Sequence, residues 1–226
     1  MWAIVPIKQL ERAKARLAKV LSPEQRRSLM LAMARDVLTS LSRAHMLEGI
    51  LIVSRTTEAD ALAQTFGTEK FAESPEANLS IALTQASDYL LRQFKASGVM
   101  IVPADLPLIS PKEVDEVIEK HRTGPPPRIS LIPDNQKIGT NCLICSPPNT
   151  IDYIFDGKSF HPHMQAAIAK NLTPTIILSS GFALDIDTPN DLAELLRRSP
   201  NSQTAIYLTK SGLAEAMDNQ LLSTKN

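Results

Sequence analysis

The regular alternation of two kinds of segment over residues 2–133 constrains the fold of this chain most. Short runs rich in Ile and Val are typical of buried strands, and segments whose apolar residues recur with helical spacing separate them. Strands separated by helices favour a mostly parallel sheet with helices on both faces, so we expect an α/β domain. The expected strands are Trp2–Ile7, Gly49–Ser54, Gly67–Glu73, Val99–Pro103 and Arg128–Pro133.

Two of the intervening helices begin with a recognisable capping sequence. In Ser22-Pro23-Glu24-Gln25, a Ser at the N-cap is followed by Pro at the first helical position and Gln at the third. The sequence Ser110-Pro111-Lys112-Glu113 repeats this pattern with Glu. We expect the first helix to run to about Leu41, and two further helices to cover residues 58–66 and 78–94.

The rhythm changes at residue 134. A polar turn over 134–139 precedes a predicted strand over 140–146, a helix over 159–170, and short strands over 175–178 and 182–184. A last helix begins at Asp187-Thr188-Pro189, with an acidic or Thr cap, and ends near Arg198. We take residues 1–198 as one domain and 199–226 as a C-terminal tail with one or two short helices around Tyr207 and Ala214.

The composition excludes several classes of protein. Hydrophobic residues make up 43% of the 226, enough for a sizeable core, and the 24 basic and 24 acidic residues leave no formal net charge. This balance argues against a general nucleic-acid binder. No apolar run approaches the roughly 18 residues of a membrane span, no secretory signal is apparent, and two cysteines make no disulfide framework. We expect a cytoplasmic protein with neither a nucleic-acid nor a membrane partner.

Four cations directly follow the first expected strand: Lys8, Arg12, Lys14 and Arg16. Cations gathered where a strand ends are typical of a phosphate site. The chain has only eight glycines and neither of the common glycine-rich phosphate-binding motifs, so side chains would have to bind the phosphates. A solvated charge run is the alternative interpretation.

Acidic residues follow later elements. Asp105 stands just past the end of the strand at 99–103, where ligands bind in open α/β sheets, and it is placed either to hold Mg²⁺ or to cap a turn. If Asp185 ends a strand, alternation puts Asp185 and Asp187 on one face. Asp187 is alternatively the N-cap of the last helix. One of the pair would complete a Mg²⁺ site with Asp105.

A rival zinc site is disfavoured. Cys142 and Cys145 precede His161 and His163, which faintly resembles a Cys₂His₂ pattern. Residues three apart on a strand face opposite sides of the sheet, so the two thiols are better interpreted as core residues. No arrangement suggests a protein nucleophile. Cations, Mg²⁺ and positioning alone are sufficient for phosphoryl or nucleotidyl transfer.

Several segments, in this order, resemble one family: IVPIK and AK-x-RLA at the start, ADLPLI, GTN-x-L-x-x-x-PP, F-x-x-x-SF-x-x-H and LDIDTP-x-DL. Together they resemble the CofC/FbiD guanylyltransferases of coenzyme F(420) biosynthesis over residues 2–195. The resemblance implies a single-domain, Rossmann-like nucleotidyltransferase fold. It also implies transfer of GMP from GTP to 2-phospho-L-lactate, phosphoenolpyruvate or 3-phospho-D-glycerate, with release of pyrophosphate.

The resemblance also implies roles for the charged residues. Lys8 would contact phosphates at the reacting centre, and Lys14 and Arg16 would hold the triphosphate of GTP. Asp105 would act in catalysis by binding Mg²⁺, with Asp185 and Asp187 as further ligands.

The remaining implied contacts concern the nucleotide and the acid. Thr140 and Ser159 would bind the acid together with Asp156, which stands where the family often has Gly. Ser80 replaces a frequent Asn in the nucleotide-facing helix start, where Asn78 would compensate. Some relatives are dimers, so a homodimer is possible. The alternatives are a nucleotidyltransferase with another acceptor, such as molybdopterin or a sugar phosphate, and a non-catalytic nucleotide-binding protein on the same fold.

Overall fold

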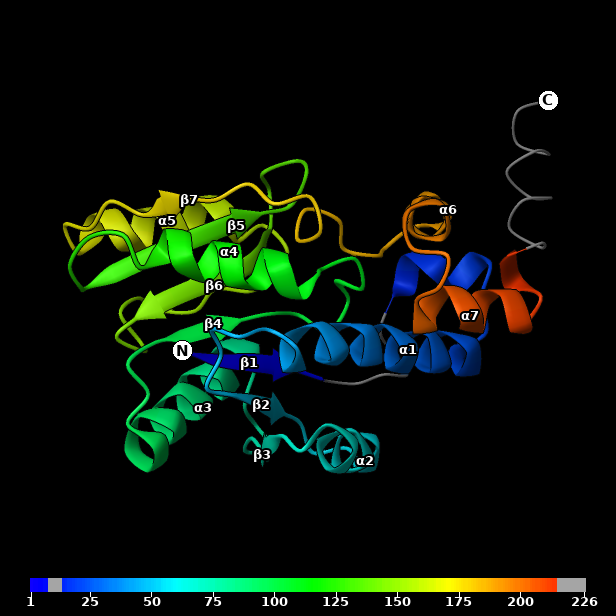
Figure 1. Ribbon diagram of the computed structural model, residues 1–226, viewed down its shortest axis with the longest axis horizontal. Helices are drawn as coiled ribbons and strands as arrows, with labels where there is room; N and C mark the ends of the chain where they lie inside the picture. Colours follow the sequence, from blue (N-terminus) through cyan, green and yellow to red (C-terminus); the bar gives the residue numbers. More distant parts are fainter. Residues whose placement is uncertain (8–13, 215–226) are drawn as a thin grey trace.

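The computed structural model describes residues 1–7 and 14–214, and these residues form a seven-stranded sheet with the order β3-β2-β1-β4-β6-β5-β7 (Figure 1). The predictions for Lys8 and Arg12 lie outside the described residues. The strands are β1 Trp2–Pro6, β2 Gly49–Val53, β3 Glu69–Phe71, β4 Val99–Ile101, β5 Arg128–Pro133, β6 Thr140–Ser146 and β7 Thr175–Ile176.

The predicted mostly parallel sheet is confirmed. β1 pairs in parallel with β2 and β4, β2 with β3, and β5 with β7, whereas β6 runs antiparallel to both β4 and β5. The chain moves outward from β1 to β3 and then returns to β4 on the other side of β1. Such a reversal of direction opens a crevice at the carboxyl ends of the two central strands, where ligands bind in this class of fold.

Helices cover both faces of the sheet, as predicted. One hydrophobic cluster joins the sheet to α1, α2 and α4, and the other joins it to α3 and α5. Cys142 belongs to the first cluster and Cys145 to the second, so the two thiols face opposite sides, as expected. The helices are η1 Ala15–Lys19 (a 3₁₀ helix), α1 Pro23–Ser42, α2 Thr57–Phe66, α3 Leu79–Phe94, α4 Pro111–His121, α5 Phe160–Ala169, α6 Pro189–Arg198 and α7 Gln203–Lys210.

The capping predictions hold at both Ser-Pro sequences, where Ser22 and Ser110 each accept a hydrogen bond from the backbone N–H three residues on. At the last helix the N-cap is Thr188, not Asp187. Its hydroxyl accepts from the N–H of Asp191, whose carboxylate accepts in return from the N–H of Thr188. The carboxylate of Asp187 is therefore left for another role.

The strand predicted over 182–184 is wrong. Residues 180–183 form a turn, closed by a 3.0 Å hydrogen bond from Ala183 N–H to the carbonyl of Ser179. The Glu113 carboxylate at the start of α4 stabilises this turn by accepting from the Ser179 hydroxyl at 2.8 Å and from Gly181 N–H at 2.7 Å. The carbonyls of Phe182 and Ala183 accept from the Asn141 side chain and from Asn135 N–H, so this segment makes no strand ladder and strand alternation does not place Asp185 and Asp187.

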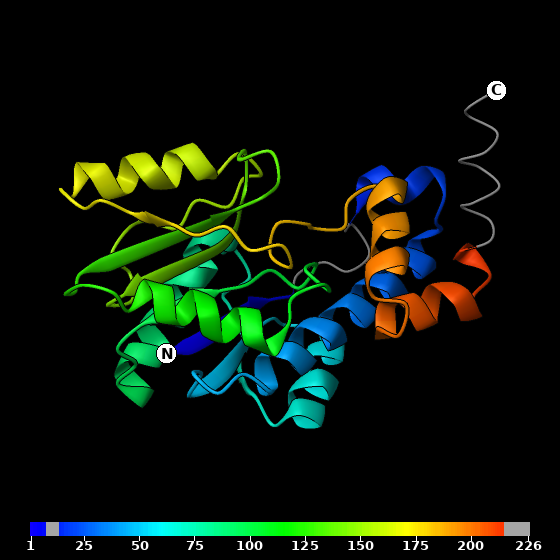
Figure 2. The same ribbon diagram turned by 45° about the horizontal axis from the view of Figure 1, so that its top comes forward.

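The strand predicted over 67–73 is shorter than expected, since β3 covers only Glu69–Phe71. Beyond the sheet, α6 and α7 lie at the N-terminal end of α1 (Figures 1 and 2). Asp36 of α1 accepts from the N–H groups of Gln203 and Thr204 at the start of α7. Within the described ranges, no helix combines the length and the apolar character that crossing a membrane requires.

Candidate active site

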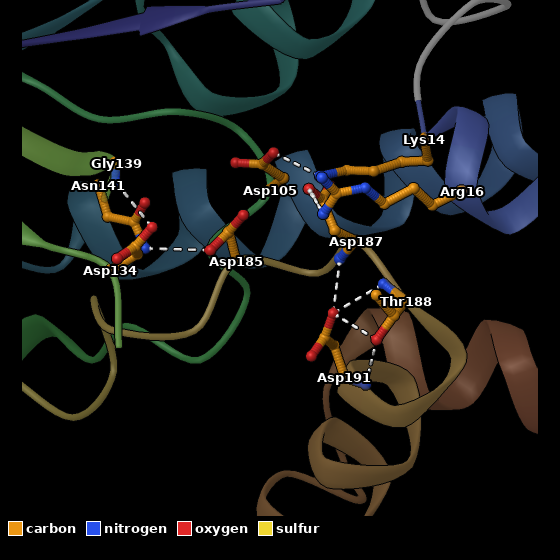
Figure 3. A network of polar contacts seen from close by, with 10 residues as sticks. All are labelled: Lys14, Arg16, Asp105, Asp134, Gly139, Asn141, Asp185, Asp187, Thr188 and Asp191. Carbon is orange, nitrogen blue, oxygen red and sulfur yellow. Dashed lines mark hydrogen bonds and ion pairs between the residues drawn. The ribbon is translucent and has the colours of Figure 1, made fainter. Parts of the chain in front are cut away.

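The site is built around Asp105, which follows the end of β4 at Ile101. Its carbonyl oxygen accepts a 3.2 Å hydrogen bond from Ile186 N–H, which holds the segment between the 180–183 turn and α6 beside it. The ammonium of Lys14 then lies 2.6 Å from a carboxylate oxygen of Asp105 and 2.6 Å from one of Asp187 (Figure 3). Three segments that are distant in the sequence therefore meet at one buried cation.

Lys14 enters from the residue before η1, where its backbone has the left-handed φ of 57°. Its side chain is only 5% exposed. Burial by itself lowers the pKa of this ammonium, but the carboxylates of Asp105 and Asp187 together raise its pKa above the ordinary value. Arg16 stands at the rim: its guanidinium is 3.7 Å from the second carboxylate oxygen of Asp187, and its side chain is 76% exposed.

Asp185 is held from the other side by Asn141. The Asn141 amide donates to a carboxylate oxygen of Asp185 at 3.3 Å (Figure 3). It also donates to the carbonyl of Phe182 at 2.8 Å. Burial raises the pKa of Asp185, and the nearby carboxylates of Asp105 and Asp187 raise it further. The three predicted acidic residues therefore lie near enough to repel one another. Sequence reasoning did not assign a role to Asn141, although it belongs to the GTN segment.

A β-bulge explains why neighbouring residues at the start of β6 serve different parts of the site. Ile132 pairs with Cys142 and Pro133 with Thr140, so Asn141 is an extra residue in β6. Asn141 therefore points toward the Phe182 side of the sheet, as Cys142 does, while Thr140 points toward α5. Bulges re-aim side chains in this way beside many active sites.

Thr140 and Ser159 meet on the α5 side, as the family pattern implies. The backbone N–H of Thr140 donates to the hydroxyl oxygen of Ser159 at 3.0 Å. The Thr140 hydroxyl lies 2.9 Å from Nδ1 of His163, which is fully buried on α5. These two residues thus lie side by side and are buried, Thr140 at 4% and Ser159 at 2% exposure. The sequence pattern indicated no role for His163 other than the disfavoured zinc ligand, although it ends the F-x-x-x-SF-x-x-H segment of the family pattern.

Among the described residues, no hydrogen bond joins Asp156 to these hydroxyls, although its carboxylate is near enough to His163 to raise the pKa of that ring against the effect of burial. Asp156 is exposed, and its carboxylate accepts from the N–H of Lys158 at 2.9 Å, within its own turn. The following Gly157 has a φ of 86°, a conformation that favours glycine. The shape of this loop therefore depends on Asp156 as a turn-forming residue and on the glycine one position later than the family usually has it.

Asn78 is the N-cap of α3, since its side-chain oxygen accepts from Ile81 N–H at 2.9 Å. It also lines a cavity of about 560 Å³ beyond the ends of β1 and β2. Ser80, in the first turn of α3, does not belong to this lining. A smaller cavity of about 160 Å³ lies between the first cavity and Asp105, and shares Ile7 and Leu79 with it. The two cavities are therefore neighbours, the larger lined by Asn78 and the smaller by Asp105.

The three carboxylates suit Mg²⁺, which prefers oxygen ligands. Among the described residues, however, no group of three or more His, Cys, Asp or Glu side chains is already arranged around a metal position. The carboxylates are instead engaged with other side chains, since Lys14 bonds to Asp105 and Asp187, and Asn141 bonds to Asp185 (Figure 3). The residue types suit the ion, and in this arrangement the ammonium of Lys14 supplies the positive charge between Asp105 and Asp187.

Solved structures of known nucleotidyltransferases have a similar fold. A nucleotidyl transferase from Methanothermobacter thermautotrophicus is similar in structure, with a TM-score of 0.65 and 16% identity, over 86% of this chain and 94% of that one. A Desulfovibrio desulfuricans G20 protein described as a candidate nucleotide-diphospho-sugar transferase has a TM-score of 0.77 at 16% identity, over 97% and 96% of the two chains. The architecture is thus that of the nucleotidyltransferases.

Sequence comparison narrows this class. Residues 1–220 match the family described as guanylyl transferase CofC like, and the chain belongs to this family. A phosphoenolpyruvate guanylyltransferase from Sphaerobacter thermophilus is 35% identical over 198 residues, which are 88% of this chain and 93% of the relative. A 2-phospho-L-lactate guanylyltransferase from Methanobrevibacter ruminantium is 33% identical over 224 residues, 94% of this chain and 92% of the relative. The resemblance inferred from the short segments is confirmed.

Proposed function

We propose that this chain transfers GMP from GTP to a small phosphorylated three-carbon acid, with release of pyrophosphate, in coenzyme F(420) biosynthesis. One observation supports this most: Lys14, Asp105 and Asp187 converge at the carboxyl ends of β1 and β4, in a chain that matches the guanylyltransferase family over residues 1–220. A relative named for phosphoenolpyruvate and one named for 2-phospho-L-lactate have nearly the same sequence identity to this chain, 35% and 33%. The proposal therefore names the class of acid and not one member of it.

The chemistry requires charge neutralisation more than proton transfer. The phosphate of the acid is largely anionic at neutral pH, so no side chain has to act as a general base. One phosphate oxygen attacks the α-phosphorus of GTP in line, and pyrophosphate leaves. Lys14 and Arg16 would bind the triphosphate oxygens, and Lys8 is proposed for the reacting centre. Such cations stabilise the charge that accumulates in the transition state.

Mg²⁺ is proposed as the cofactor, held by Asp105, Asp185 and Asp187. Once bound, the ion would neutralise phosphate charge and orient the reacting groups. The ammonium of Lys14 now bonds to two of these carboxylates, so it would have to leave them for the triphosphate. A flexible lysine with three donors suits such an exchange of partners.

The cavity of about 560 Å³ is the proposed site of the guanosine moiety, since Asn78 lines it and it shares Ile7 and Leu79 with the smaller cavity that Asp105 lines. Ser80 is the less direct of the two predicted nucleotide contacts. Thr140, Ser159 and the loop at Asp156 are proposed for the acid. The reaction would take place in the cytoplasm, where GTP and phosphorylated acids are available, and would require no nucleic acid.

Pyrophosphate release tests the proposal. Full-length chain with GTP and Mg²⁺ is given each of the three acids in turn, and the guanosine product is identified by mass. We expect release with at least one acid. Asp105→Asn should lower turnover at least about 100-fold, the loss seen when one strong electrostatic contact to the transition state is removed, while the circular dichroism spectrum stays unchanged.

Glu116→Gln on α4 is the matched control, because this half-exposed carboxylate pairs only with Lys112 among the described residues. It should retain full turnover. Absence of pyrophosphate release with all three acids, or wild-type turnover in Asp105→Asn, would contradict the proposed function.

A further inference from the structure

His163 is a buried, hydrogen-bonded group to which the proposed mechanism assigns no role. It lies on α5, four residues after Ser159, and is inaccessible to solvent. Its Nδ1 is 2.9 Å from the Thr140 hydroxyl, and its Nε2 accepts a 2.9 Å hydrogen bond from Ile154 N–H. Phe155 packs edge-on against the ring, with 5.1 Å between ring centroids. The imidazole is therefore held on three sides.

These contacts determine where the imidazole carries its proton. A backbone N–H only donates, so Nε2 must present its lone pair to Ile154. In the neutral ring the proton is then on Nδ1, and Nδ1–H donates to the oxygen of Thr140. Burial lowers the pKa of His163 to about 4, so the ring is neutral at physiological pH. Geometry and burial thus select the same single tautomer.

The tautomer of His163 determines which hydrogen bonds the Thr140 hydroxyl can still make. Its hydroxyl oxygen accepts from His163, and the hydroxyl oxygen of Ser159 accepts from the N–H of Thr140. Each hydroxyl still has one proton to donate. Within residues 1–7 and 14–214, neither proton has an acceptor among the hydrogen bonds of the structure. Two adjacent donors without acceptors are the complement of an anionic oxygen.

We propose that His163 is a positioning residue, which acts through Thr140 to aim the Thr140 and Ser159 hydroxyls as a donor pair at an anionic oxygen of the acid substrate. The inference rests on the proposed function, because it takes the acid as the ligand. The bulge at Asn141 makes it possible, since it turns Thr140 toward α5 while Asn141 holds Asp185. The single bulge in β6 thus positions both Thr140, which is proposed to bind the substrate acid, and Asn141, which bonds to Asp185.

The test compares KM for the acid with KM for GTP in variants of the full chain. His163→Phe keeps an aromatic ring beside Phe155 and removes both hydrogen bonds. We expect KM for the acid to rise about 10- to 100-fold, the effect of one hydrogen bond to a charged group, and KM for GTP to stay within about twofold. His163→Asn, which keeps a donor near the position of Nδ1, should recover part of this loss. The exposed His161→Asn on the same helix is the control and should match the wild type.

A double-mutant cycle separates positioning from simple structural support. Thr140→Val should raise KM for the acid, and adding His163→Phe to it should cause no further rise. Independent effects that multiply would overturn the inference, as would equal rises in both KM values. Thr140→Ser keeps the hydroxyl and should remain sensitive to His163→Phe.

NMR of ¹⁵N-labelled histidine in the wild-type chain examines the tautomer without any substitution, and so remains informative if His163→Phe does not fold. A proton on Nε2 would overturn the inference even if guanylyltransferase activity is found. Absence of pyrophosphate release with every acid would instead refute the proposed function and, with it, the acid as ligand. A proton on Nδ1 together with the coupled KM effects supports the proposal.

Discussion

Replacing Lys14 with Met tests how the carboxylate cluster is kept together. Met has nearly the same length and can stay buried, but it offers no charge to Asp105 and Asp187. Removing one partner of a fully buried ion pair costs about 3–5 kcal/mol. The side chains of Asp105 and Asp187 are 23% and 37% exposed, so water compensates some of this loss. We expect a loss of about 1–3 kcal/mol, which lowers Tm by roughly 2–12 °C in a chain of this size.

The assay is thermal unfolding in EDTA and then at increasing Mg²⁺. In EDTA, Lys14→Met should melt below the wild type, because three carboxylates that influence one another are left without their buried cation. Added Mg²⁺ should raise Tm of the variant more than that of the wild type, because in the variant the ion does not compete with an ammonium. The control is Lys112→Met, whose side chain is 87% exposed on α4.

Equal Tm values for Lys14→Met and the wild type in EDTA would refute the structural role of the ammonium. Equal stabilisation of both proteins by Mg²⁺ would refute the idea that Lys14 and the ion share one position. Turnover of the variant should stay low at any Mg²⁺ concentration, since Lys14 is also proposed to bind the triphosphate. Stability and activity are thus expected to respond differently to the metal.

Two further predictions concern buried groups away from Lys14. Glu113→Ala removes the acceptor for Gly181 N–H and the Ser179 hydroxyl, so we expect a loss of about 1–3 kcal/mol by urea unfolding and lower turnover. Ser110→Ala removes the helix cap and the Ser110 hydroxyl bond to Glu113 but leaves the bonds of Glu113 to the turn, so it should keep turnover. His121 is buried between Ser130 and Ser146, and burial, then Arg128 and Arg122, lower its pKa to about 4. Because the pKa of this imidazole is about 6.5 in the unfolded chain, the free energy of unfolding falls by about 3 kcal/mol as pH falls from about 6.5 toward 4. His121→Asn should make the free energy of unfolding depend less on pH over this range. An unchanged pH dependence would contradict the role of His121.

The parallel strands of the sheet were predictable because, over residues 2–133, the strand and helix signals in the local sequence agree with the final fold. Short Ile- and Val-rich runs and the caps at Ser22 and Ser110 depend on nearby residues only. The region after residue 134 was less predictable, because distant partners decide its structure. The 180–183 turn depends on Glu113, which lies about 70 residues earlier and whose sequence context indicates only a helix cap.

The candidate site was predictable in its residue types and not in its contacts. The order of the family segments indicated Lys14, Asp105, Asp185 and Asp187, and the structure brings these four together. The ion pairs of Lys14 with Asp105 and Asp187 could not be predicted, since nothing in the sequence indicates that a lysine bonds to the predicted metal ligands. The role of Asn141 depends on a bulge, and a single extra residue in a strand leaves no periodic signal.

The use of glycine also distinguishes this site from glycine-rich phosphate loops. A Cβ at Gly139 would lie 3.0 Å from a carboxylate oxygen of Asp134, and one at Gly181 would overlap the carboxylate of Glu113. At both positions glycine lets an internal carboxylate approach backbone N–H groups, as a phosphate does in the common motifs.

These internal carboxylates hold the two segments that lead to the site: Gly139 directly precedes Thr140, and the turn at Gly181 precedes Asp185. These backbone N–H groups are consequently used to shape the loops, and we propose that side chains bind the substrate phosphate. This proposed division is consistent with a chain that has only eight glycines and whose sequence places cations directly after β1, the strand that borders the crevice.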